Sequence, residues 1–300
     1  MKILISGGSG LIGSALTKLL MANGHEVNHL SRSKSSENNI PTFVWNLAKG
    51  EIDEAAFDGV EAIIHLAGAG IADERWTEKR KKIIIDSRVE SANLLYRKAK
   101  ELKPPLKVFI SASGINYYGM KTTDKIYTEE DRPTDDFIGK CCLLWEEAAD
   151  QFDDIARVVK LRTGVVLSAE GGALEKIAKP IKLGVGAQLG SGKQWVPYIH
   201  IDDLCAMYLE VLENETYEGV YNAVNGDHVT NKDLTKKTAK VLGKPLWLPN
   251  VPSFVLIAAL GDMSGLVLDG SRASAEKIKN QGFEFRFENL EEALTAIYST

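Results

Sequence analysis

Three glycines near the start of the chain carry the clearest chemical signal. Gly7, Gly10 and Gly13 stand between a short apolar run, residues 2–6, and a segment with apolar side chains at helical spacing, residues 11–23. Between a strand and a helix, such glycines permit a tight turn, the approach of a pyrophosphate to the backbone and close packing of the helix on the strand. The N–H groups and partial positive charge at the start of the helix attract the anion. This stretch is therefore predicted to bind a dinucleotide through Gly7, Ser9, Gly10, Leu11, Ile12 and Gly13.

The second apolar run, residues 26–30, ends in Ser31, Arg32 and Ser33. NAD-selective sites usually carry an acidic residue at this point, which accepts hydrogen bonds from the ribose 2′-hydroxyl. This chain has none there, and the planar guanidinium of Arg32 between two hydroxyls suits a 2′-phosphate instead. The pattern predicts NADP(H) in preference to NAD(H), with a plain surface role for Arg32 as the alternative.

Two further strand ends carry candidate cofactor contacts. Asn46 follows the run 42–45, and its amide suits either an adenine edge or a turn. The run 61–68 ends in Leu66, Ala67 and Gly68, and such small residues let the backbone pass close to a ligand. His65, just before them, is interpreted as a buried core histidine.

Composition limits the class of protein. The 300 residues are 44% hydrophobic, which suffices for one large core or for a core with a smaller lobe. A net charge of −5 does not indicate nucleic acid or an anionic membrane as a partner, and the longest apolar stretch, residues 254–260, is too short to span a bilayer. Three cysteines without a CxxC pattern, no clustered metal-ligand spacing and no expected signal peptide favour a cytoplasmic protein without a metal.

The elements that would position these residues alternate along the first half of the chain. Strands are expected near 2–6, 26–30, 42–45, 61–68, 106–111 and 156–162, with helices near 11–23, 77–100 and 137–152. This alternation predicts an α/β fold, a Rossmann-type doubly wound parallel sheet with right-handed crossovers. Ligands in such sheets bind at the carboxyl ends of the strands, where Gly68, Ser113 and Gly164 would join the glycine turn.

The second half is less regular. A strand is expected near 220–223, a helix over 231–243 and a mostly helical segment after Pro252. We therefore predict a nucleotide-binding core over residues 1–165, with strands returning from about 195–225. Residues 166–300 would form a smaller, mostly helical substrate lobe, with a C-terminal domain from about residue 245.

At this point the chain resembles the extended or atypical branch of the short-chain dehydrogenase/reductase superfamily. The resemblance rests on the glycine turn, on His65–Gly68 and on Ile199–Leu204. It is closer still to the subfamily labelled YfcH-like NAD-dependent epimerase/dehydratase, and it spans essentially the whole chain. The motifs that carry this closer match are Arg75–Thr77, Ser87–Arg88, Ser111–Ser113, Tyr117–Gly119, Trp145–Glu146, Gly190–Trp195, Val229–Asn231 and Gly282–Phe285. The resemblance implies an NAD(P)-binding fold, with NADP(H) favoured among relatives, and leaves the reaction open.

Typical relatives use a serine or threonine together with a YxxxK pair. The lysine holds the nicotinamide ribose and lowers the pKa of the tyrosine, which relays a proton during hydride transfer. Lys140 matches the lysine, but Asp136 stands four residues before it, and its favoured interpretation is a helix N-cap. A substitute phenol could come from Tyr117 or Tyr118.

The resemblance thus implies Ser113, Tyr117 or Tyr118, and Lys140 as candidate catalytic residues. In the alternative interpretation the tyrosines only line the pocket and Lys140 only holds the ribose. By family position Arg75, Arg88, Trp195 and His200 would line the substrate pocket, although Trp195 could be packing and His200 could join a strand to a helix.

Two functions remain open. One is an NADP-dependent oxidoreductase or nucleoside-diphosphate-sugar epimerase that acts on a small polar or sugar-like molecule. The other is a non-catalytic NADP(H)-binding protein used for interaction or redox sensing, which Asp136 at the tyrosine position favours. The substrate and the oligomeric state, including a homodimer, stay open.

Overall fold

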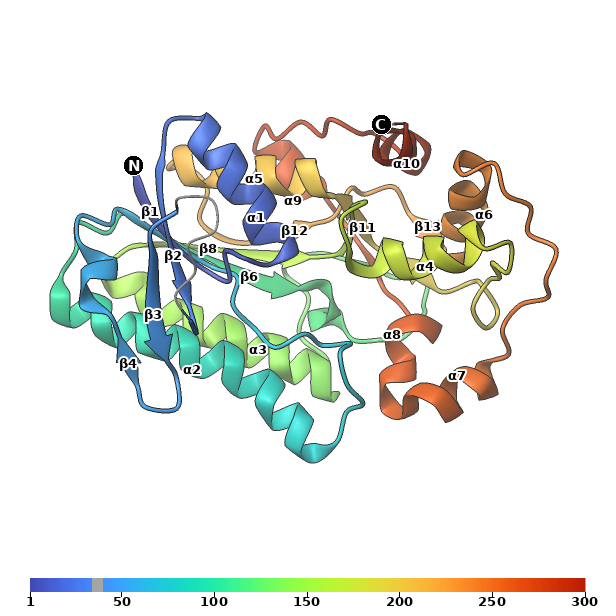
Figure 1. Ribbon diagram of the computed structural model, residues 1–300, viewed down its shortest axis with the longest axis horizontal. Coiled ribbons are helices and arrows are strands. Elements are labelled where there is room, and N and C mark those ends of the chain that lie inside the picture. Colours follow the sequence, from blue (N-terminus) through green and yellow to red (C-terminus); the bar gives the residue numbers. More distant parts are fainter. Residues whose placement is uncertain (34–39, 300) are drawn as a thin grey trace.

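An eight-stranded sheet forms the centre of the molecule (Figure 1). The computed structural model describes residues 1–33 and 40–299. The strands lie in the order β12-β8-β6-β5-β1-β2-β3-β4, and neighbouring strands are parallel except for the antiparallel pair β3–β4. Their bounds are β1 Lys2–Ser6, β2 Glu26–Ser31, β3 Thr42–Asn46, β4 Glu51–Ile52, β5 Ala62–His65, β6 Val108–Gly114, β8 Arg157–Thr163 and β12 Gly219–Ala223. The predicted Rossmann-type α/β fold is confirmed.

Helices cover both faces of this sheet (Figure 1). Helices α1 (Leu11–Ala22) and α5 (Ile201–Glu213) lie on one face, and α2 (Glu78–Leu102) and α3 (Phe137–Asp150) lie on the other. Successive strand residues point to opposite faces, so Ile3 and Ile5 pack in the core with α1 and α5 while Leu4 packs in the core with α2. Burial on both faces explains why the strands are almost continuously apolar in sequence.

The path of the chain fixes the place of a ligand crevice. From β1 the chain moves outward through β2 and β3, and it then returns to β5 on the other side of β1 before continuing to β6, β8 and β12. The connections after β1 and β5 therefore diverge, and the crevice at the carboxyl ends of these two strands is the usual ligand site of such sheets.

The second half of the chain forms small sheets and helices beside the carboxyl ends of the main strands (Figure 1). A separate apolar core, which includes Leu174, Tyr198, Leu234 and Leu294, holds much of it together. In contrast, Ile278 and Phe283 pack into the main core, so the chain passes back to the large sheet before its last helix. The elements are β9 Val165–Leu167, α4 Gly172–Lys182, β10 Trp195–Val196, β11 Tyr198–His200, β13 Val229–Thr230, α6 Asn231–Val241, α7 Ser253–Leu260, α8 Gly265–Leu268, β14 Arg272–Ala273, α9 Glu276–Asn280 and α10 Leu290–Tyr298.

Shorter elements complete the fold. They are strand β7 (Ile126–Tyr127) and the 3₁₀ turns η2 (Glu54–Phe57), η3 (Ile115–Tyr118), η4 (Gln151–Asp154) and η5 (Gly261–Ser264). The small sheets pair β10 with β13, β11 with β9, and β14 with β7. Within residues 1–33 and 40–299, no helix combines the length and the apolar character needed to cross a bilayer.

Candidate cofactor and substrate site

The glycine turn joins β1 to α1 with very little space around it. Gly7 has a φ of 81°, a conformation that favours glycine, and the Gly10 N–H donates to the Gly7 carbonyl at 3.1 Å. A Cβ at Gly13 would lie 2.3 Å from the Gly7 oxygen, so α1 could not pack this closely with a larger residue there. Gly10 is the N-cap of α1, and the first turn contains no acidic side chain. The start of α1 therefore suits an incoming diphosphate.

A fourth glycine in this turn also lacks room for a side chain. A Cβ at Gly8 would lie 2.4 Å from the imidazole of His29, which stands on β2 and shares a hydrogen bond of 2.8 Å with the Thr17 hydroxyl. Neither Gly8 nor His29 was assigned a role from the sequence. The only signal in the sequence is the doubled glycine at positions 7 and 8.

The residues predicted to select NADP(H) lie at the end of β2, next to β1. Arg32 and Ser33 are exposed, and the Ser33 N–H points to the Ser31 hydroxyl oxygen at 3.5 Å. No acidic residue occurs at positions 31–33. The guanidinium of Arg32 is thus placed at the carboxyl edge of the sheet, on the side of the turn away from β5.

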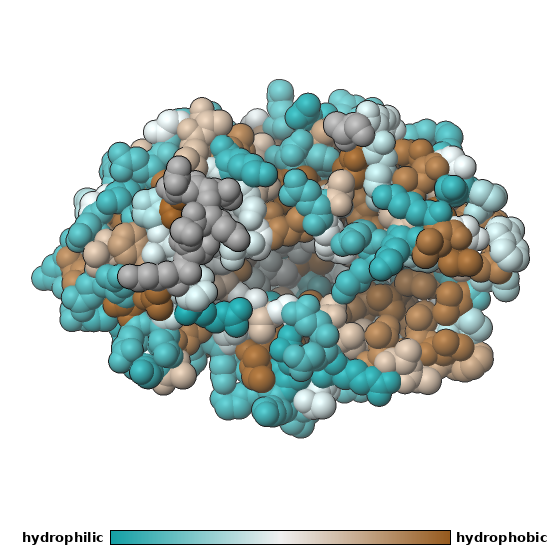
Figure 2. Space-filling view, viewed as in Figure 1, coloured by the Kyte–Doolittle hydropathy of each residue, from teal (hydrophilic) through white to brown (hydrophobic). Residues whose placement is uncertain are grey.

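The ends of β3 and β5 differ in what they present. Asn46 is exposed and its Oδ1 accepts from the Lys49 N–H at 3.2 Å, which is the turn role left open for it. Leu66 and Ala67 lie directly against the turn, because a Cβ at Gly7 would be 2.9 Å from the Leu66 carbonyl carbon. The face of the molecule in Figure 2 is hollowed near its centre, where in Figure 1 the main strands end beside the second half of the chain.

His65 is a satisfied core histidine. Its Nδ1 lies 2.6 Å from the Ser6 hydroxyl, and its Nε2 lies 3.0 Å from the Ser91 hydroxyl. Burial lowers the pKa of His65 to about 4, so the ring is neutral in the folded protein at neutral pH.

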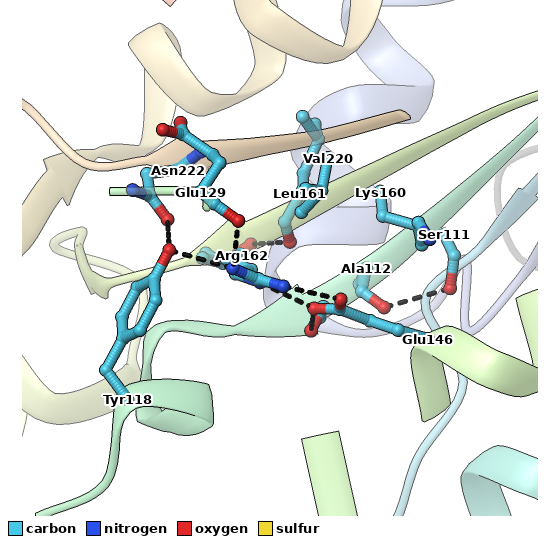
Figure 3. Close-up of polar contacts among 12 residues, drawn as sticks. Ser111, Ala112, Tyr118, Glu129, Glu146, Lys160, Leu161, Arg162, Val220 and Asn222 are labelled. Carbon is cyan, nitrogen blue, oxygen red and sulfur yellow. Dashed lines mark hydrogen bonds and ion pairs between the residues drawn. The ribbon is translucent and has the colours of Figure 1, made fainter. Parts of the chain in front are cut away.

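A buried ion pair joins Arg162 and Glu146 (Figure 3). Arg162 on β8 donates from Nε and Nη2 to the two carboxylate oxygens of Glu146 on α3, at 2.7 and 2.8 Å. The Ser113 hydroxyl donates to the same carboxylate at 2.7 Å. Burial alone would lower the pKa of Arg162, but the hydrogen bonds and charge of Glu146 raise it above its ordinary value. Because the Ser113 hydroxyl donates its proton to Glu146, it presents lone pairs to any further partner.

The two candidate tyrosines are both buried against this arginine. The Tyr118 hydroxyl donates to Asn222 Oδ1 and accepts from Arg162 Nη1, each at 2.8 Å, as Figure 3 shows. Burial raises the pKa of Tyr118 to about 12. The ring of Tyr117 lies 3.4 Å from the Arg162 guanidinium carbon, and burial raises the pKa of Tyr117 as well. Both phenols therefore hold their protons tightly, and Tyr118 is fully engaged within the protein.

Lys140 lies on the exposed stripe of α3 with Leu144 and Glu147, whereas Glu146 lies on the buried face. The helical phase that buries Glu146 thus turns Lys140 to solvent. Near the same end of the helix, Ile138 and Cys142 are buried and stand four residues apart. In the described part of the chain no hydrogen bond joins Lys140 to Ser113, Tyr117 or Tyr118, and the predicted group of serine, tyrosine and lysine stays a prediction.

Asp136 is the N-cap of α3, as interpreted from the sequence. Its Oδ1 accepts from the Gly139 N–H at 2.8 Å, and its Oδ2 accepts from the Thr134 hydroxyl at 3.1 Å. A carboxylate committed to these two bonds stabilises the start of the helix.

Three of the four predicted substrate-pocket residues have contacts that fit a structural role. Arg75 donates to the carbonyls of Ala258 and Ala259 at the end of α7. The Trp195 indole donates to the Thr123 carbonyl at 3.0 Å, and its ring stacks on Arg272 at 4.6 Å. His200 is the N-cap of α5, where Nδ1 accepts from the Asp202 N–H at 3.0 Å. These contacts match the packing and strand-to-helix alternatives considered for Trp195 and His200.

Arg88 differs from the other three because its guanidinium lies at the carboxyl edge of the sheet. A Cβ at Gly68 would be 2.9 Å from the guanidinium carbon, which also lies 4.9 Å from the Trp145 ring. Of the four predicted pocket residues, this one is placed directly against a predicted cofactor contact.

Glu146 and Arg162 were not assigned a role from the sequence. Glu146 was noticed only as part of a matching motif, and Arg162 only as the end of a strand. The available signal was Arg162 near the carboxyl end of a largely apolar strand, at the edge where ligands bind. Among the described residues, no cluster of three or more histidine, cysteine, aspartate or glutamate side chains could hold a metal ion.

The fold and the glycine turn define a dinucleotide-binding protein of the Rossmann type. The chain belongs to the NAD dependent epimerase/dehydratase family, whose sequence profile matches residues 3–224, and a domain of unknown function (DUF1731) matches residues 251–297. The predicted resemblance to the extended short-chain dehydrogenase/reductases is confirmed, and the chain is an NAD(P)-binding member of this epimerase family.

Individual relatives cover the whole chain. The epimerase family protein YfhF of Bacillus subtilis is 36% identical over 99% of this chain and 98% of its own length. The crystal structure of human epimerase family protein SDR39U1 with NADPH has a TM-score of 0.88 at 32% identity, over 100% of this chain and 99% of that one. UDP-glucuronic acid 4-epimerase of Bacillus cereus, solved with UDP-glucuronic acid and NAD, has a TM-score of 0.80 and covers 100% of this chain and 98% of its own, but at 19% identity it shows the fold alone.

Proposed function

We propose that this protein binds NADP(H) in preference to NAD(H). The observation that carries the proposal is Arg32 at the end of β2, without an acidic neighbour at positions 31–33 to accept the ribose hydroxyl. The similarity to the human protein whose structure contains NADPH supports it. The start of α1 would hold the diphosphate, and Leu66 to Gly68 would pass beside the dinucleotide.

Calorimetric titration of the purified protein with NADPH and NADH tests this preference. Arg32→Ala removes one charge-assisted contact to the extra phosphate, which corresponds to about 10- to 100-fold in affinity. We expect that loss for NADPH and less than twofold for NADH. The matched control is Arg97→Ala, an exposed arginine of α2. An equal loss for both dinucleotides would contradict the assignment.

We propose further that the protein transfers hydride to or from a small polar substrate, as an oxidoreductase or an epimerase. The nicotinamide supplies the hydride acceptor or donor when it is bound. Ser113 would accept a hydrogen bond from a substrate hydroxyl, because the proton of the Ser113 hydroxyl is already donated to Glu146. Nucleotide sugars are one candidate class, by analogy with the UDP-glucuronic acid 4-epimerase of the same fold.

A second candidate is a non-catalytic NADP(H)-binding protein. It is favoured by the outward position of Lys140 and by Ile138 and Cys142 at the buried positions four residues apart on α3. Neither of these two side chains can serve as the phenol and ammonium of the usual proton relay. A role in binding or redox sensing would need the dinucleotide but not turnover.

A substrate panel separates the two candidates. If hydride transfer is the function, bound NADPH is oxidised by at least one carbonyl compound or nucleotide sugar, and Ser113→Ala lowers that turnover while Ser253→Ala on exposed α7 does not. Tight NADPH binding without turnover over the whole panel would support the second candidate. A loss of turnover in Lys140→Ala would contradict the outward placement of that lysine.

The cellular compartment proposed for this chain is the cytoplasm. All three cysteines are buried and unpaired, which fits a reducing environment.

A further inference from the structure

Arg88 occupies a position on α2 that normally belongs to an apolar residue. It stands one turn after Ile84 and three residues before Ser91, and both of these neighbours are buried. Residues three and four apart share a face of a helix, so the Arg88 side chain projects from the buried face of α2. A charge placed there needs compensation.

The protein compensates Arg88 only in part. Its Nη1 donates to the carbonyls of Ala69 and Ile84, at 3.1 and 2.9 Å. Its Nε and Nη2 make no hydrogen bond to residues 1–33 or 40–299, and no carboxylate of these residues lies within ion-pair distance. Burial lowers the pKa of the Arg88 guanidinium, with the nearby charge of Arg80 as a smaller cause in the same direction.

Two other arginines in this region differ from Arg88 because each lies beside a carboxylate of its own chain. Arg80, two turns earlier on the same helix, lies 3.6 Å from Asp73 and 3.4 Å from Glu74. Arg162 is held by both oxygens of Glu146. Arg88 is half-buried, and charged groups partly withdrawn from water are usually paired. The Nε and Nη2 of Arg88 thus remain able to pair with an anion that does not belong to the described residues.

The guanidinium of Arg88 lies against the segment that follows β5, at the edge of the sheet where the ligand crevice is predicted. The guanidinium touches Gly68, and the neighbouring residues Leu66 and Ala67 touch Gly7 of the dinucleotide turn. On the side toward β6, Cys142 lies near Arg88 and also 3.4 Å from the Cβ position of Gly114. Arg88 is therefore positioned near the carboxyl ends of β5 and of β6, the strand that carries Ser113.

We propose that Arg88 binds an oxyanion, a carboxylate or phosphate group, carried by the substrate that lies beside the dinucleotide. The free Nε and Nη2 form the side of a planar fork that matches two oxygens of such a group. The stack on Trp145 holds the plane of the fork. The inference rests on the proposed dinucleotide site, and it adds that the substrate carries a negative charge.

Anion binding to the NADPH-saturated protein tests the proposal. Titration with inorganic phosphate and with oxalate should show one binding event in the wild-type protein. Arg88→Met should weaken it about 10-fold or more, because a charge-assisted contact is lost. Arg88→Lys keeps the positive charge but lacks the planar fork, so its affinity for the anions should lie between those of the wild type and of Arg88→Met. This second variant preserves the test if Arg88→Met does not fold. Arg97→Met on the exposed face of α2 should match the wild type.

Several results would overturn the proposal. It fails if the NADPH-loaded wild type binds neither anion, or if Arg88→Met binds them as tightly as wild type. A tenfold loss of NADPH affinity in Arg88→Met, with no anion binding to the loaded wild type, assigns the oxyanion to the dinucleotide and overturns its assignment to a substrate. If the wild type does not bind NADPH at all, the dinucleotide proposal fails, and titration of the unloaded protein then decides on Arg88 separately.

Discussion

At the scale of single residues, the pair of Arg162 and Glu146 connects β8 to α3 inside the protein. Their exposed fractions are only 2% and 5%, and Ser113, Tyr118 and Asn222 complete the hydrogen bonding around them. A fully satisfied buried network of this kind holds its members in one arrangement. Removal of one partner leaves the other charge buried without compensation.

Glu146→Gln should therefore destabilise the protein strongly. Breaking a buried pair costs about 3–5 kcal/mol of unfolding free energy, because Arg162 is left unpaired. Urea unfolding followed by circular dichroism measures the loss. The double variant Glu146→Leu with Arg162→Met should recover a large part of it, since both charges are removed together. A loss below about 1 kcal/mol in the single variant would contradict the importance of this pair.

His65 should make the stability depend on pH. Its pKa is about 4 in the folded protein, because burial disfavours the charged ring, and about 6.5 in the unfolded chain. Between these values the unfolded chain binds a proton that the folded protein does not, so the free energy of unfolding falls as the pH falls. His65 stabilises the fold above pH 6.5, and about 3 kcal/mol of that contribution is lost as the pH falls through 4.

Urea unfolding of the wild type and of His65→Gln at several pH values between 7 and 4 measures this effect. The variant should show the smaller decrease over this range, whatever its stability at pH 7. Parallel curves for the two proteins would show that His65 does not titrate in this way.

At the level of helices and strands, α7 is unusual because it is apolar in sequence and yet poorly buried. Its sequence is apolar along its length, yet none of its residues is buried, and Phe254 and Ile257 are 72% and 53% exposed. Apolar residues also gather at the lower right of Figure 2, over the region of α7 in Figure 1. Leu260 packs against a small apolar cluster, and Arg75 donates to two carbonyls at the C-terminal end of the helix. A cation at this end donates hydrogen bonds to carbonyls that have no partner within the helix, and it interacts favourably with the negative end of the helix dipole.

Arg75→Met should therefore loosen α7 while the large sheet stays intact. We expect faster amide hydrogen exchange in residues 253–260, because the helix loses its main polar attachment. Mass spectrometry of peptic fragments measures this exchange. Lys79→Met, a change of an exposed cation on α2, should leave the exchange of α7 at the wild-type rate. Unchanged exchange in Arg75→Met would show that other contacts hold α7.

At the scale of the whole molecule, the second half of the chain is fastened to the nucleotide-binding half across the crevice. Met263 packs with Trp76, Ile84 and Ile138, and Lys81 lies 3.4 Å from Asp262. A ligand in the crevice binds the folded protein and not the unfolded chain. It should therefore raise the free energy of unfolding of the whole molecule.

NADPH should raise the free energy of unfolding by about 2.7 kcal/mol at a concentration one hundred times its dissociation constant. Thermal unfolding at increasing NADPH concentrations measures the effect. NADH at the same concentrations should produce a smaller shift, and Arg32→Ala should bring the NADPH shift down to that of NADH. Equal shifts for the two dinucleotides with the wild-type protein would contradict the predicted preference.

Much of the fold could be predicted because its signals are local. The strand, glycine turn and helix of residues 2–23 follow from hydrophobic period and glycine spacing, and Asp136 as an N-cap follows from its place before a helical pattern. The strand expected at 106–111 instead runs over Val108–Gly114, because pairing with β8 continues beyond its apolar part. Boundaries of this kind depend on neighbouring strands that are distant in sequence.

Local patterns were enough to predict the strand-and-helix alternation, the dinucleotide turn and the charge pattern at the end of β2, since each depends on residues within a few positions of one another. The meeting of Ser113, Glu146 and Arg162 comes from the folded chain, because Glu146 is 33 residues from Ser113 and 16 from Arg162. The same holds for the exposure of Lys140 and for the contact of Arg88 with Gly68. The direction of a side chain on a helix is set by which face packs against the sheet, and that packing involves the whole chain.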